Sequence, residues 1–193
     1  MIRAFTRHLH AEIASVPDRF YDSFDYTCTG RNLTHPKTLG FIAKILWQLD
    51  GVASVGIDVR INEGKGLKLQ PDVVACGPDD LPLLLVDYES PNSSDKRIPE
   101  KNVWKFLRWS SKQARPPRYL IVTTLPDRRC DDWALRYTHE KGWNRRYRKQ
   151  VALLRQNPCQ FWYDVYRKDL EGEDLRRIHF INIDGKRVTR INL

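Results

Sequence analysis

The sequence predicts an α/β protein in which a central mixed β-sheet is flanked by helices. Three apolar, β-branched runs, at 67–76, 83–90 and 118–124, are typical of buried strands. Two other segments, at 36–49 and 98–114, place apolar residues at helical spacing instead. A chain of 193 residues can bury one good core, so a single domain is the simplest organisation.

Two helices are expected first in chain order. Arg3 to Val16 is expected to form a short helix, and Thr34-His35-Pro36 is typical of a cap and first turn. The helix that follows is expected to run through about residue 49, and its apolar residues recur at helical spacing. They are Leu39, Ile42, Ala43, Leu46 and Leu49. That face is therefore expected in the core.

A strand-rich segment comes next. Residues 52–61 alternate as a strand, and 62–66 form a turn by composition. The next strand is 67–76, residues 77–80 break it, and a further strand follows at 83–90. This predicts a hairpin-like pair that leads into a buried strand.

The second half of the chain continues with helices and strands. The expected elements are a helix at 98–114, a strand at 118–124, a helix near 131–141, and strands at 161–166, 178–183 and 186–191. Pro99 suits the first turn of the first of these helices, and Pro116 and Pro117 end it. Asp184-Gly185 suits a two-residue hairpin turn between the last two strands.

Composition indicates a soluble protein with a basic excess. The formal net charge is +9, with 30% charged and 41% hydrophobic residues, which favours a polyanionic partner. No apolar stretch approaches the length that crosses a membrane, and the first residues lack a signal-peptide core, so a cytoplasmic location is expected. Four dispersed cysteines without CxxC spacing argue against a zinc site and favour reduced thiols.

Two acidic clusters lie about fifteen residues apart, each in an apolar run. Asp72 follows Pro71, and Asp87 and Glu89 follow the run that begins at Leu83. Alternation along a strand points Asp87 and Glu89 the same way. With Asp72 on the neighbouring strand, three carboxylates would meet at one edge of the sheet, where they would suit Mg²⁺. Taken singly, Asp72 could belong to a turn and Asp87 could pair with an arginine.

A Pro-Asp pair followed by an apolar strand and then by two further acids resembles the PD-(D/E)xK nuclease superfamily. Pro71-Asp72 matches the PD element and Asp87 matches the second acid, whereas Glu89 occupies the usual Lys position. The resemblance is closest to the Uma-type restriction endonuclease branch, where an acid, two residues and Ser-Pro precede a helix that bears a Lys. Asp87-Tyr88-Glu89-Ser90-Pro91 fits that pattern, and Lys101 lies ten residues beyond.

The resemblance covers about residues 36–125 and implies a restriction-endonuclease-like core, with 126–193 as a basic C-terminal extension of the same domain. It implies hydrolysis of DNA with Mg²⁺, or Mn²⁺ as a substitute, held by Asp72, Asp87 and Glu89. The bound metal would lower the pKa of a water molecule and neutralise charge in the transition state. Lys101 would position that water or stabilise the developing charge, with Lys105 as the alternative.

Two basic segments are candidates for DNA contact. On the predicted helix 98–114, Lys101, Lys105, Arg108, Lys112 and Arg115 fall on one stripe without an acid, and a polyanion would relieve their repulsion. In 141–149, aromatic residues interleave with five cations, which suits phosphate contact and stacking. These cations include Arg145, Arg146, Arg148 and Lys149. A solvated surface is the alternative for both segments.

Two rival functions remain open from the sequence. The chain could be a catalytically inactive nuclease-fold module that binds nucleic acid, which the Glu89 substitution favours, or a module that binds an acidic protein. A homodimer would serve cleavage of both DNA strands, although no residue pattern indicates one. The sequence contains no Gly-rich phosphate loop and no GxSxG motif, so a small-molecule enzyme is not favoured.

Overall fold

The computed structural model describes residues 1–15, 31–63, 67–89, 97–125, 149, 152–161, 174–184 and 187–191. Its helices are α1 (Ile2–Ser15), α3 (Arg31–Leu46), α4 (Arg97–Ser110) and α8 (Asp174–Arg177). Its strands are β1 (Ser54–Ile57), β2 (Ile61–Glu63), β3 (Leu67–Leu69), β4 (Val73–Cys76), β5 (Pro82–Tyr88), β6 (Arg118–Leu125), β7 (Ile178–Asp184) and β8 (Arg187–Ile191). The expected α/β class with helices around a mixed sheet is confirmed.

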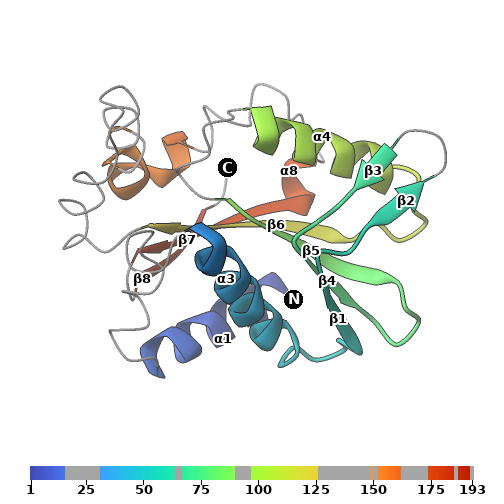
Figure 1. The fold of residues 1–193 in the computed structure, drawn as a ribbon, viewed down its shortest axis with the longest axis horizontal. Coiled ribbons are helices and arrows are strands. Elements are labelled where there is room, and N and C mark those ends of the chain that lie inside the picture. The colour runs from blue at the N-terminus through green and yellow to red at the C-terminus, as the bar shows by residue number, and fades with distance from the viewer. Residues whose placement is uncertain are drawn as a thin grey trace.

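A six-stranded sheet forms the centre of the molecule, in the order β1-β4-β5-β6-β7-β8 (Figure 1). β4 is antiparallel to both β1 and β5, whereas β5, β6 and β7 run parallel, and β8 closes the edge antiparallel to β7. Strands β7 and β8 come from the predicted C-terminal extension, so that part of the chain completes the main sheet. β2 and β3 form a separate two-stranded hairpin.

Helices cover both faces of this sheet (Figure 1). α1 turns one apolar stripe inward, with Ile2, Phe5, Leu9 and Ile13 buried at helical spacing. This stripe shares a core cluster with α3 and with one face of the sheet. Burying each such side chain contributes roughly 1.5–3 kcal/mol, so packing rather than intrinsic propensity holds the helix in place.

α4 covers the opposite face. Val103, Phe106 and Trp109 are buried there against Leu85 and Tyr119 of the central strands. The Phe106 and Tyr119 rings stack with centroids 4.6 Å apart. This contact fixes the helix above β5 and β6, close to the carboxyl end of β5.

Each of the two long strands that the sequence predicts between 52 and 76 is divided in the structure. The first divides because Asp58 adopts a left-handed backbone with φ 53°, which Asp tolerates better than most residues. The second divides before Val73, since Pro71 lacks an amide hydrogen for the ladder. The expectation of two unbroken strands is therefore wrong, and both breaks lie beside the acidic residues.

Other boundaries shift by a few residues. α3 begins at Arg31 and contains Pro36, so the predicted cap at 34–36 is wrong. α4 ends at Ser110 rather than 114. Phe161 lies in a helical stretch instead of starting a strand, and Asp184 pairs with Arg187, so Asp184 belongs to β7 rather than to the predicted turn. The predicted helix near 131–141 and residues 162–166 lie outside the described residues. No helix of the described ranges is both long and apolar enough to span a membrane.

Candidate functional site

Asp72 lies in the bend that leads into β4, directly opposite the end of β5. Its Oδ2 accepts a hydrogen bond from the backbone N–H of Tyr88 at 2.7 Å, and its own N–H donates to Oδ1 of Asp87 at 3.1 Å. Its carbonyl accepts from the N–H of Asp58 at 2.9 Å. The two aspartates that the sequence analysis paired are thus brought together by reciprocal contacts between β4 and β5.

Asp87 is buried at the end of β5, on the side that faces α4. The Tyr119 hydroxyl donates to its Oδ2, and the Asn102 side chain of α4 also hydrogen-bonds to it. Burial, together with the charge of Asp72, raises the pKa of Asp87 to about 7, while these hydrogen bonds act in the opposite direction. A cation beside Asp87 would therefore stabilise its charged form.

Glu89 follows β5 and joins the same cluster. Its N–H donates to the carbonyl of Val122 at 2.9 Å, which extends the pairing with β6 past the end of the strand, and its side chain is buried. Burial, together with repulsion from Asp87 and Asp72, raises the pKa of Glu89 to about 8. The three carboxylates are thus near enough for their charges to act on one another, but their ligand atoms are not the ones that gather most closely in the described part of the chain.

A second group extends the cluster toward α3. His35 Nε2 lies 3.5 Å from Oδ1 of Asp72, and the hydrogen bond to Asp72 raises the pKa of His35. Asp58 completes the group, since one ligand atom from each of the three residues lies within 4.8 Å of the others. Imidazole ligands suit transition metals such as Zn²⁺, so this set does not select for Mg²⁺.

The sequence analysis missed His35 and Asp58 as members of the site. Its pattern places His35 in a helix cap and Asp58 in the interior of a strand, where neither would meet Asp72. In the structure α3 passes across the sheet so that His35 also lies against the Tyr88 ring, with centroids 5.8 Å apart. The one available signal was the position of Asp58, a turn-forming residue four positions before the polar run that begins at Asn62.

Lys101 is placed on α4 beside Asn102, which reaches Asp87. The side chain of Lys101 lies outside the described part of the chain. Lys105, the alternative, is half-buried and follows Asn102 by three residues, so the two share one face of the helix. The geometry therefore brings the first turns of α4 to Asp87 through Asn102, and the roles of Lys101 and Lys105 stay predictions.

The predicted basic stripe on this helix is only partly continuous. Arg108 lies with its guanidinium over the Trp104 ring, 5.3 Å from the centroid. Lys112 and Arg115 lie beyond the end of α4, and Arg115 approaches Asp79 at 3.8 Å. The expected five-cation helical stripe is therefore wrong in its last two members.

The second predicted basic segment is described at one position only. Lys149 is exposed and helical. Arg145, Arg146 and Arg148 lie outside the described residues.

Comparison with known proteins adds no relative. No protein-family model, no curated protein and no solved structure matches this chain.

Proposed function

We propose that this protein is a metal-dependent endonuclease that hydrolyses DNA phosphodiester bonds, with a centre of the PD-(D/E)xK type on a restriction-endonuclease-like core. The observation that carries the proposal is the contact of Asp72 with Asp87, through the N–H of Asp72 and Oδ1 of Asp87. The element order supports it as well. Acids on two antiparallel strands are followed by a helix and then by a strand parallel to the second.

In the proposed centre Asp72 and Asp87 hold the cation, and Glu89 contributes a third carboxylate. Bound Mg²⁺ or Mn²⁺ would supply a water of lowered pKa and charge neutralisation at the phosphate. Tyr119 and Asn102 orient Asp87 by donating to it, which leaves its remaining lone pairs for the metal. Lys101 stabilises charge on the phosphate, with Lys105 as the alternative. Arg108, Lys112 and the basic residues of 141–149 contact the DNA backbone.

Cleavage of supercoiled plasmid tests this proposal. We expect nicking or linearisation with Mg²⁺ or Mn²⁺ and none with EDTA. Asp72→Ala should abolish cleavage while salt-sensitive DNA binding remains, because the phosphate contacts are separate from the acidic centre. Asp72→Asn preserves the shape of the side chain and should behave alike, and Asp50→Ala, an exposed turn residue with the same charge change, is the matched control. Cleavage that survives both Asp72 variants would refute the site.

A second candidate is a nuclease-fold module that binds nucleic acid without cutting it. Glu89 favours this function, because a carboxylate replaces the cation that the resemblance implies at that position. The same assay separates the two candidates. DNA that shifts on a gel without a divalent metal, and is not cut with any metal, would establish the binding module.

A further inference from the structure

α1 carries a second stripe beside its buried one. Arg3, Thr6, Arg7 and His10 recur at steps of three, one and three residues, which at 100° per residue places them within one sector of the helix. That sector adjoins the apolar stripe rather than opposing it. Both α3 and β8 pack against α1, and β8 is the element that meets this polar sector.

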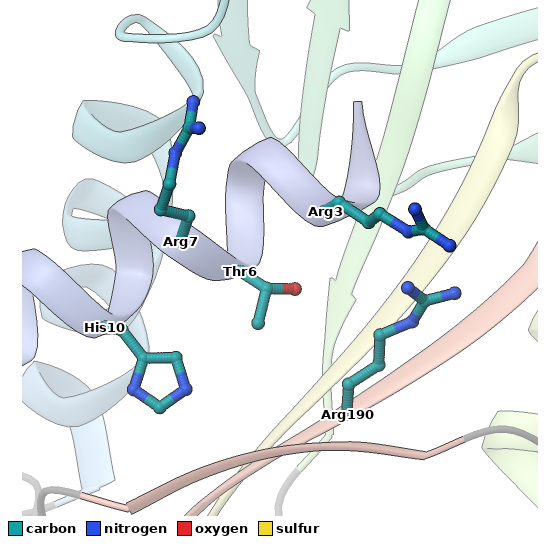
Figure 2. A pocket seen from close by; sticks show the side chains of 5 residues that line it. All are labelled: Arg3, Thr6, Arg7, His10 and Arg190. Carbon is teal, nitrogen blue, oxygen red and sulfur yellow. The ribbon is translucent and has the colours of Figure 1, made fainter.

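A pocket of about 390 Å³ lies between α1 and β8, lined by these four residues and Arg190 (Figure 2). Figure 2 shows the Arg3 and Arg190 guanidinium groups directed toward one another from the helix and the strand. Thr6 and His10 point toward the same space, whereas Arg7 points away from Arg190. Two cationic groups therefore converge from different elements on one cavity.

No carboxylate balances these charges within the part of the chain that the structure describes. None of the lining side chains is acidic, and neither Arg3 nor Arg190 forms an ion pair with a described residue. The Nε of Arg190 is buried and has no hydrogen-bond partner among those residues. Two converging guanidinium groups repel each other, and an anion between them would attract both and offset that repulsion.

The pKa of His179 is affected by the same positive charge. His179 of β7 has its pKa lowered to about 4, first by burial and then by the charges of Arg118 and Arg190. Its Nε2 is also buried without a partner among the described residues. Arg118 begins β6, so the positive region continues from β8 across β7 to β6.

From this geometry we propose that the pocket between α1 and β8 binds a phosphate group. Guanidinium groups match the oxygens of phosphate in bidentate pairs, and a phosphate carries enough oxygens to meet Arg3 and Arg190 from two sides. Thr6 and His10 add polar contacts on the α1 side. The cavity is larger than one phosphate ion, so it admits the group together with part of a molecule that carries it, either a small phosphomonoester or the end of a nucleic-acid strand.

This site is independent of the proposed nuclease centre. Arg190 and Asp87 lie on β8 and β5, with β6 and β7 between them. Their side chains also lie on opposite faces of the sheet, because Asp87 contacts α4 whereas Arg190 lines a pocket with α1. Phosphate binding can therefore be measured in EDTA, where no metal at the acidic cluster contributes.

The test is calorimetric titration of the full chain with inorganic phosphate in EDTA, at an ionic strength held constant with chloride. Arg190→Gln and Arg3→Gln should each weaken binding at least about tenfold, because each removes a charge-assisted pair. Arg187→Gln is the matched control. It lies on the same strand and removes the same charge, but its odd spacing from Arg190 places it on the other face. It should leave the affinity within about twofold of the original.

A parallel titration with a short oligonucleotide, with and without a 5′-phosphate, distinguishes the two sources of the group. Tighter binding of the phosphorylated form that is lost in Arg3→Gln assigns the pocket to nucleic-acid ends. Equal binding of both forms, with inorganic phosphate still bound, assigns it to small phosphates. Arg3 is exposed on the first turn of α1, so its variant should fold even if Arg190→Gln does not. The proposal is overturned if phosphate binds no better than chloride, or if Arg187→Gln weakens binding as much as Arg3→Gln.

Discussion

Glu89→Gln should change how stability depends on pH in the metal-free protein. The folded state raises the pKa of Glu89 from 4.5 to about 8, so the fold favours the protonated side chain. This contribution is fully present below the unfolded value and is lost as pH rises through about 8. A rise of this size corresponds to roughly 5 kcal/mol as an upper limit, because water and side-chain rearrangement reduce the cost of ionisation.

The glutamine side chain of this variant is close in shape to a protonated glutamate and carries no charge at any pH. At about pH 5 the variant and the original protein should therefore differ by less than about 1 kcal/mol. At about pH 9 the variant should be more stable by about 2 kcal/mol or more in EDTA. Chemical denaturation at the two pH values measures both quantities. Adding Mg²⁺ at the higher pH should stabilise the original protein more than the variant, since the variant lacks one carboxylate.

Glu12→Gln is the control, because its effect on stability should depend on pH in the opposite direction. Hydrogen bonds from Lys44 and Gln48 lower the pKa of Glu12, so its contribution is present above 4.5 and is lost as pH falls. Glu12→Gln should thus destabilise the protein at neutral pH and have less effect in acid. If both variants respond to pH in the same direction, or if the original protein does not lose stability between about pH 5 and pH 9, the assignment of Glu89 to a buried carboxylate cluster is wrong.

Two further substitutions probe the partners of the aspartates. Tyr119→Phe removes a donor to buried Asp87 and should destabilise the protein by about 1–3 kcal/mol above pH 7, with a smaller effect near pH 5, as measured by urea denaturation. An equal loss at both pH values would mean that the hydroxyl does not serve the charged carboxylate. His35→Gln should cost up to about 1 kcal/mol in acid and less at high pH, because the pKa of His35 is raised by Asp72 and its contribution disappears as pH rises through that raised value. A loss that grows with pH would contradict the pairing.

Local periodicity explains what could be predicted from the sequence. The apolar residues of the second helix recur at helical spacing and the run at 83–88 is nearly continuous, and the structure buries that helical stripe and residues 84–88 as expected. The same period of two placed Asp87 and Glu89 on one side of their strand. The charge of Asp72 raises the pKa of both residues, and the charge of Asp87 also raises that of Glu89.

Contacts between segments far apart in the sequence explain why two residues of the site could not be predicted. His35 reaches Asp72 because α3 crosses the sheet at that point, and no local pattern near residue 35 encodes the crossing. Asp58 joins them because its backbone turns left-handed and separates β1 from β2. A window of residues that alternates from 52 to 61 gives no sign of such a turn, since Asp is tolerated in both conformations.

The position of Glu89 links these residues to the chemistry of the cluster. A Lys at that position would bring a positive charge beside Asp87, whereas Glu89 with a pKa of about 8 is largely neutral at pH 7. Protonated, it can donate a hydrogen bond, as a neutral acid does. A divalent cation that binds Asp72 and Asp87 favours the charged form of Glu89 and displaces its proton, so metal affinity should rise with pH until the acids are ionised. A Glu rather than a Lys at position 89 therefore makes the proposed metal site depend on pH. Nuclease activity should then be confined to neutral or alkaline conditions.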